Sequence, residues 1–221
     1  MSLMTTRVAQ AAASLAACAM AVAAHAKPIA FAHGTTVMGE YGADTMTEVQ
    51  AFYAPTFRYS LGVSHLTLDS AIHRATRDVT YFRANYLPKR WNLEHAQANV
   101  FVWGGVGRAH IGETSDDQFA WNVGGQIDYE TRRVYASLRT DLHEASAYSH
   151  RIDTLQLGVA PYEHDYQTLA VWFVIQARQY TGGLFRGTEY AALLRLFKGN
   201  AWLEAGATPD GKLQAMLMFN F

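Results

Sequence analysis

The sequence predicts an all-β protein, an antiparallel up-and-down transmembrane β-barrel with twelve strands as the best count. Apolar and polar residues alternate with a period of two almost everywhere after residue 45, which is typical of strands with one apolar and one polar face. No run of 18 apolar residues follows residue 26, so the mature chain has no candidate membrane helix. The four lysines of that region, Lys27, Lys89, Lys198 and Lys212, all fall outside the expected strands. Strands that face water usually carry more lysine, so the apolar face is expected to point outward, toward lipid.

The expected strands occupy residues 35–41, 47–53, 57–64, 77–86, 95–103, 119–129, 133–142, 154–161, 169–178, 189–197, 201–206 and 213–221. The clearest is 119–129, whose apolar face has aromatic residues near both ends. An apolar outer band between aromatic girdles, around a polar interior, is typical of transmembrane barrels. The first two segments alternate least cleanly. A ten-stranded barrel, with residues 27–54 as a plug or extension, is therefore the alternative; both counts are even, as such barrels require.

The expected connections alternate between the two ends of the barrel. One end receives residues 67–76, 105–117, 144–149, 181–186 and 208–211, and the other receives residues 88–92, 130–132, 163–166 and 198–200. The first set is longer on average. Transmembrane barrels show this asymmetry, with long external loops and short periplasmic turns.

The closing segment, Leu213 to Phe221, alternates apolar and polar residues and ends on an aromatic residue. It resembles the last strand of bacterial outer-membrane β-barrels, in which the terminal aromatic residue belongs to the signal read by the barrel-assembly machinery. The resemblance implies a bacterial outer-membrane location, contact with outer-membrane lipid and lipopolysaccharide, and Phe221 as the assembly signal. It leaves the oligomeric state open.

The first 26 residues have the form of a cleaved signal peptide. Arg7 precedes an apolar, alanine-rich stretch, and Ala24 and Ala26 provide the small residues before a cleavage site. We therefore expect one barrel domain over residues 27–221. The alternative is a lipoprotein signal with Cys18 as the lipidated residue. After ordinary cleavage no cysteine remains, which excludes disulfides and thiolate metal sites.

Charged side chains on the polar faces are the main functional candidates. The formal net charge is only −1, so a nucleic-acid partner is not expected. Charges enclosed by a barrel should pair or line a wet pore. We expect either a salt-bridged network filling the lumen or the lining of a small-solute, porin-like pore, formed by Arg58, Arg83, Asp128, Arg133, Arg139, Asp141, Arg178, Glu189, Arg195 and Glu204.

Histidines near the expected external loops are weak metal candidates: His73, His110, His143 and His150. Imidazole groups bind borderline divalent metals, but none of these residues has HExxH-type spacing. Residues 91–103 and 128–131 faintly resemble small uncharacterised exported barrels found beside heavy-metal efflux systems. That resemblance carries over no ligand, and it serves only to rank metal-related roles above those for other solutes.

An enzymatic site would require a nucleophile and a base near the outer rim. Ser149, His150 and Asp153 form the one suggestive cluster, but adjacent strand residues point to opposite faces. We expect no catalytic residue and no cofactor. The expected function is structural or small-solute handling, with a narrow channel or accessory barrel linked to metal homeostasis, or an outer-membrane hydrolase with a rim site, as alternatives.

Overall fold

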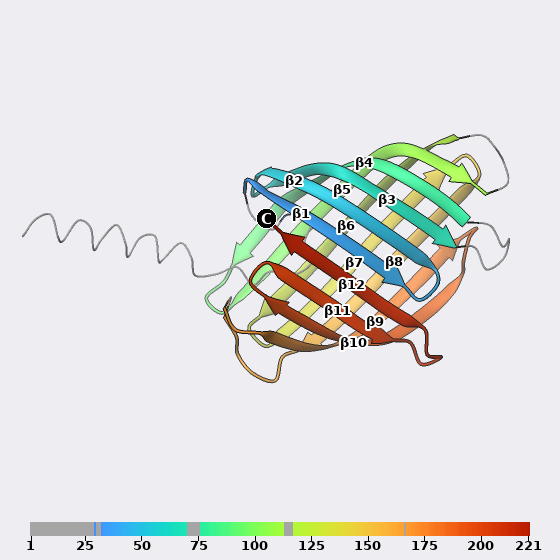
Figure 1. Cartoon of the computed structure of the whole chain (residues 1–221). Helices are drawn as coiled ribbons and strands as arrows, with labels where there is room; N and C mark the ends of the chain where they lie inside the picture. Colours follow the sequence, from blue (N-terminus) through green and yellow to red (C-terminus); the bar gives the residue numbers. More distant parts are fainter. Residues whose placement is uncertain (1–28, 30–31, 70–75, 113–116, 166) are drawn as a thin grey trace, which may run out of the picture.

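The computed structural model is a closed barrel of twelve antiparallel strands (Figure 1). It describes residue 29 and residues 32–69, 76–112, 117–165 and 167–221. The strands are β1 (Gly34–Gly42), β2 (Met46–Thr56), β3 (Tyr59–Asp69), β4 (Thr76–Asn92), β5 (Ala96–Ile111), β6 (Gln118–Thr131), β7 (Val134–Ala145), β8 (Tyr148–Val159), β9 (Ala170–Gly182), β10 (Gly187–Lys198), β11 (Ala201–Ala207) and β12 (Leu213–Asn220). The described residues contain no helix long and apolar enough to cross a membrane.

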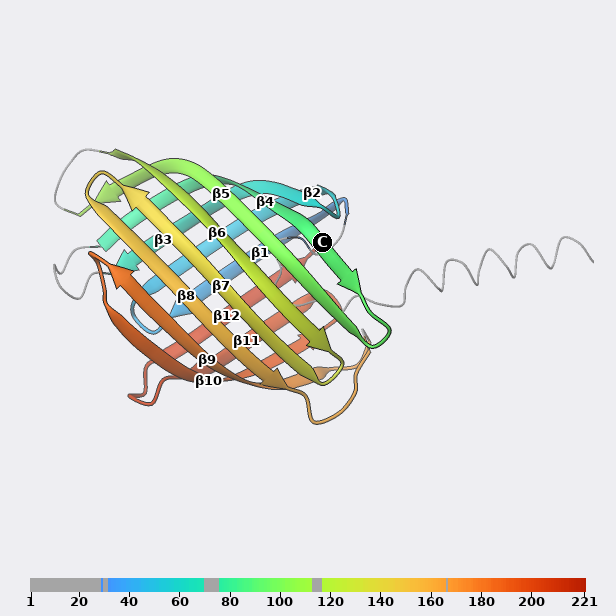
Figure 2. The same ribbon diagram turned by 180° about the vertical axis from the view of Figure 1, so that it is seen from behind.

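Each strand pairs with its neighbours in the chain, and β1 pairs with β12 to close the ring. Figure 2 shows β5 to β8 forming the opposite wall. The predicted all-β fold, an up-and-down barrel of twelve antiparallel strands, is confirmed. The ten-stranded alternative is wrong, because the segment it assigned to a plug forms β1 and β2. The predicted signal peptide and Cys18 lie outside the described residues.

The apolar face of the alternating pattern points outward on every strand. In β6, for example, Phe119, Val123 and Ile127 are exposed, whereas Asn122 and Asp128 are buried. A soluble barrel with an apolar core would show the reverse arrangement. The expectation that the apolar face points outward is therefore confirmed.

Two prolines occur where neighbouring strands slip in register. The β2–β3 pairing shifts between Tyr53 and Thr56, around Pro55, and the β4–β5 pairing shifts between Tyr86 and Lys89, around Pro88. Proline lacks the amide hydrogen that a regular ladder requires, and it is tolerated at bulges. The predicted turn at residues 88–92 is wrong, because β4 continues through the bulge to Asn92.

Lysine is not absent from the strands, contrary to the prediction. Lys89 lies within β4, and Lys198 is the last residue of β10. Both are exposed near the barrel end that also holds Phe221.

We call the barrel end that holds Phe221 the terminal end. It carries the β2–β3, β4–β5, β6–β7, β8–β9 and β10–β11 connections, and the other connections lie at the opposite end, which we call the far end. The β8–β9 connection spans residues 160–169, so long connections are not confined to the far end.

Candidate functional site: a salt-bridged lumen

The structure places eight of the ten predicted lumen charges on inward-facing strand positions, all of them buried or half-buried: Arg83, Asp128, Arg139, Asp141, Arg178, Glu189, Arg195 and Glu204. The other two are corrections. Arg58 lies in the β2–β3 turn, and Arg133 lies in the β6–β7 turn, where its guanidinium donates to the carbonyl oxygens of Ala160 and Pro161. Both are exposed, because the strands end before these positions and alternation no longer fixes the direction of a side chain.

The first part of the network joins β1, β7 and β9 across the lumen. Arg178 donates to one carboxylate oxygen of Glu40, and Arg139 approaches the other at 3.8 Å. Nε of Arg139 also donates to Asp141 at 2.6 Å. Two arginines thus share one glutamate, and the chain of contacts continues to a second carboxylate.

Arg83 on β4 extends this row. It contacts Glu48 at 3.2 Å and Asp141 at 3.7 Å. The indole of Trp103 donates to Asp141 at 2.7 Å, and its ring lies against the guanidinium groups of Arg83 and Arg139, with separations of 5.0 and 5.3 Å. The carboxylates neutralise the arginines, while the aromatic ring provides a cation–π contact and fixes their positions.

A second part of the network lies nearer the terminal end. Nε of Arg195 donates to Glu204 at 2.6 Å, and its Nη2 donates to Gln156 at 2.7 Å. The hydrogen bonds continue from Gln156 to Gln176 at 2.9 Å and from Gln176 to Gln214 at 2.6 Å. This chain runs from β10 through β8 and β9 to β12, so it connects strands that are not all direct neighbours.

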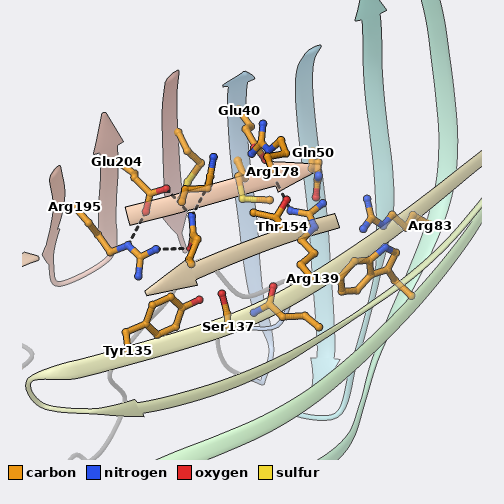
Figure 3. A pocket seen from close by; sticks show the side chains of 16 residues that line it. Glu40, Gln50, Arg83, Tyr135, Ser137, Arg139, Thr154, Arg178, Arg195 and Glu204 are labelled. Atoms are coloured by element: carbon orange, nitrogen blue, oxygen red, sulfur yellow. Dashed lines mark hydrogen bonds and ion pairs between the residues drawn. The ribbon is translucent and has the colours of Figure 1, made fainter. Parts of the chain in front are cut away.

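A cavity of about 80 Å³ separates the two parts of the network (Figure 3). Its lining includes Glu40, Arg139 and Arg178 from the first part and Arg195 and Glu204 from the second. Its volume suffices for a few water molecules or one small ion.

Apolar clusters fill the lumen on both sides of the network. At the far end, one cluster gathers buried residues from β2, β3, β4, β5, β6, β8, β9 and the β9–β10 connection: Met46, Leu66, Leu68, Val79, Tyr81, Ala109, Ile111, Ala120, Tyr148, Ile152, Tyr180 and Leu184. At the terminal end, two further clusters include the fully buried Trp172, Trp202 and Phe101. The ion pairs are therefore enclosed between apolar layers.

Two of the predicted metal candidates, His143 and His150, face each other across β7 and β8. Both are buried inside the far-end half of the barrel. The Tyr81 hydroxyl lies 3.4 Å from Nδ1 of His143, and the ring of His150 stacks on Tyr180 at 5.9 Å. The described residues hold no group of three or more His, Cys, Asp or Glu side chains placed to bind a metal.

The remaining metal candidates do not join this pair. His110 points outward and lies 3.4 Å from Asp117, whereas His73 falls outside the described residues. The rim cluster considered for hydrolysis is also divided. Ser149 is exposed and donates to Glu144, while His150 points into the lumen, so the two side chains lie on opposite faces of β8.

Several residues of the network or of the cavity lining were not among the predicted residues: Glu40, Glu48, Gln50, Tyr135, Gln156, Gln176 and Gln214. Glu40 and Glu48 belong to β1 and β2, where the alternation is weakest. Their inward direction follows from Met38 and Gln50, which occupy the same parity and are buried. The signal that could have found them was an acidic residue on the polar face of a strand.

No family model, curated protein or solved structure matches this chain. The functional inference therefore depends on the geometry of the barrel.

Proposed function

We propose that the protein is an outer-membrane β-barrel with a structural role, whose lumen is closed to solutes at rest. The observation that carries this proposal is the filling of the lumen. Arginine–carboxylate pairs occupy its middle, and apolar clusters lie between them and both ends. A porin-like channel would need a continuous water-filled path, and the central cavity is too small to provide one.

The outer surface supports a membrane location. Each of the twelve strands contributes at least one large exposed apolar side chain, such as Val37 on β1, Phe173 on β9 and Leu217 on β12. Soluble monomers rarely expose contiguous apolar patches of more than a few hundred Å², and here the patch encircles the barrel. Exposed aromatic residues, including Phe119 and Trp91, lie toward the two ends of the strands, as in the girdles of membrane barrels.

The closing strand supports assembly by the barrel-assembly machinery. The backbone of Phe221 exchanges hydrogen bonds with Thr35 at 2.8 and 2.9 Å, which continues the β1–β12 seam. Its side chain is 69% exposed on the outer surface. We expect Phe221→Ala to lower the yield of assembled protein in the outer membrane, whereas Ala215→Ser, an outward change within the same strand, leaves the yield near the wild-type level.

Planar-bilayer recording tests the closed state. The purified protein should insert without a steady open level, whereas a porin prepared in the same way should conduct. A reproducible open level with defined ion selectivity would contradict the closed lumen and favour the narrow-channel alternative.

Location is tested separately. The protein should fractionate with the outer membrane, contact lipid and lipopolysaccharide there, and migrate faster on a detergent gel when it is not boiled. Recovery as a soluble periplasmic monomer would contradict the membrane assignment.

A further inference from the structure

The bulge in β4 turns Lys89 and Trp91 toward the outer surface at the terminal end. The β4–β5 register shifts between Tyr86 and Lys89, and past the shift Lys89 and Trp91 are exposed while Arg90 is half-buried. Nε of Arg90 donates to the buried Asn99 at 2.7 Å. Regular alternation from the exposed Tyr86 would have turned Arg90 outward and Lys89 inward. The bulge thus re-aims a cation and a large aromatic ring to the outside.

Arg58 adds a second cation beside the bulge. The amide of Leu87, within the bulge, donates to the carbonyl oxygen of Arg58 at 2.7 Å, so the β2–β3 turn is fixed against β4. The guanidinium of Arg58 lies 5.5 Å from the ring centre of Phe57, and the Lys89 ammonium lies 5.6 Å from that of Trp91. Two cations, each beside an aromatic ring, therefore meet on one surface. We call it the bulge patch: Phe57, Arg58, Tyr59, Tyr86, Lys89 and Trp91.

The protein does not neutralise the cations of the bulge patch. Within the part of the chain that the structure describes, neither Arg58 nor Lys89 forms an ion pair with a carboxylate. Cations at the far end differ, since Arg108, Arg151 and Lys212 lie 3.4, 2.9 and 3.8 Å from carboxylate oxygens. The terminal end thus presents positive charge that an external anion can neutralise.

The position of the bulge patch restricts this anion. Phe57, Tyr86 and Trp91 are 52%, 45% and 44% exposed, and they continue the outward apolar surface of β3 and β4 to the terminal end. Aromatic rings that border the apolar belt of a membrane barrel lie at the level of the lipid headgroups. The anion available at that level is a lipid phosphate, and arginine and lysine both bind phosphate oxygens through charge-assisted hydrogen bonds.

The net charge of the patch selects the class of headgroup. The patch contains two cations and no carboxylate, and the next acidic residue after Lys89 in the chain, Glu94, lies past the end of β4 and 3.6 Å from His95. A zwitterionic headgroup would bring an ammonium group for which the patch has no partner. We infer that the bulge patch binds the headgroup of an anionic phospholipid, whose phosphate accepts from Arg58 and Lys89. This inference rests on the proposed membrane location.

Quenching of Trp91 fluorescence by brominated lipids tests the site directly. The protein is inserted into phosphatidylcholine vesicles that contain increasing fractions of brominated phosphatidylglycerol or brominated phosphatidylcholine. The difference between the wild type and Trp91→Phe gives the signal of Trp91, which should be quenched at lower fractions of the anionic lipid. Trp121, exposed on β6 and paired with Glu144, is measured in the same way through Trp121→Phe and should show no such preference.

A matched pair of double variants locates the effect. Arg58→Gln with Lys89→Gln should weaken the preference of the Trp91 site for the anionic lipid by about fivefold for each charge removed. The control, Arg132→Gln with Lys198→Gln, removes the same charge from the terminal end. Arg132 lies in the β6–β7 connection and Lys198 ends β10, away from β3 and β4 in the ring, so the control should keep the preference.

The outcomes separate the lipid site from the membrane location. Equal quenching of Trp91 by the two lipids in inserted wild-type protein would overturn the inference and leave the location intact. The same conclusion follows if the preference is unchanged in the variant that lacks Arg58 and Lys89. Failure to insert into any vesicle, seen as the loss of faster migration of the unboiled sample, would contradict the membrane location and the lipid site together.

Discussion

Replacing Arg195 with leucine would leave the carboxylate of Glu204 buried without its cationic partner. The two side chains are 2% and 8% exposed, and their charged atoms are 2.6 Å apart. Breaking a buried pair by removing one partner typically costs about 3–5 kcal/mol of unfolding free energy. Gln156 stays within 3.2 Å of Glu204 and recovers only part of this loss. We therefore expect Arg195→Leu to destabilise the barrel by about 3 kcal/mol or more.

The double variant, Arg195→Leu with Glu204→Leu, should cost much less than Arg195→Leu alone. Replacing both members of a buried pair with apolar groups is often close to neutral, because neither charge is left without a partner. Some cost remains, since Arg195 also packs on Tyr135 and Trp202 at 4.5 and 4.7 Å, and a cation–π contact contributes about 0.5–2 kcal/mol. The measurable signature is a strongly non-additive double-mutant cycle.

Reversible urea unfolding in detergent or lipid vesicles, followed by tryptophan fluorescence, measures this cycle, because Trp172 and Trp202 are buried in the adjacent cluster. The exposed pair Arg151–Asp153, with charged atoms 2.9 Å apart, is the control, and its cycle should yield less than about 1 kcal/mol. Additive effects at Arg195 and Glu204, or a loss below about 1 kcal/mol for Arg195→Leu, would refute the view that buried ion pairs hold the lumen together.

Three further outcomes are expected. Gly124→Val should destabilise the barrel by about 1–3 kcal/mol through overpacking, because a Cβ at this position would lie 2.3 Å from Nε1 of Trp103. Unfolding titrations measure this loss, and a variant as stable as the wild type would contradict the close approach of Gly124 and Trp103. In lipid vesicles, Val123→Arg should cost about 2–4 kcal/mol and Phe119→Arg, nearer the strand end, about 0–1 kcal/mol, whereas equal costs would argue against a membrane belt. Burial lowers the pKa of His164 in the β8–β9 connection, so folding favours the neutral form. The stability that this provides is present above the unfolded pKa of about 6.5 and is lost as the pH falls. The protection factors of the amides in this connection, corrected for the intrinsic exchange rate at each pH, should therefore fall on acidification in the wild type but not in His164→Gln.

The sequence was sufficient to divide each strand into two faces, because a period of two leaves only two choices. Alternation alone does not say which face points outward; that choice came from the scarcity of lysine and the resemblance of the closing strand to outer-membrane barrels. Arg178 and Glu204 were placed in the lumen for this reason, since both lie within well-alternating strands. Arg58 and Arg133 failed because the same parity was extended into turns. Strand ends depend on the pairing partner, which no local pattern contains.

The partners within the network were beyond prediction for a related reason. Arg178 and Glu40 are 138 residues apart in the chain, and alternation states which face a side chain occupies but not which residue lies opposite in the lumen. Glu48 meets Arg83 only because β2, β3 and β4 pair in a specific register. The filling of the lumen could not be derived either. Trp172 and Trp202 lie on strand faces that also carry polar residues, and how the two side chains pack depends on the diameter of the barrel.

The pairing of Arg178 with Glu40 also links assembly order to charge. These residues belong to β9 and β1, and the seam beside them joins Thr36 to Asn220, 184 residues apart, at 2.8 Å. An incompletely closed sheet would hold β1 away from β9, so Glu40 would lack its arginine while the sheet edges remained unpaired. Such intermediates combine uncompensated charge with open edges, and contacts this distant in the chain form slowly. The ion pair between Arg178 and Glu40 therefore adds an electrostatic cost to any state in which β1 has not yet closed on β12.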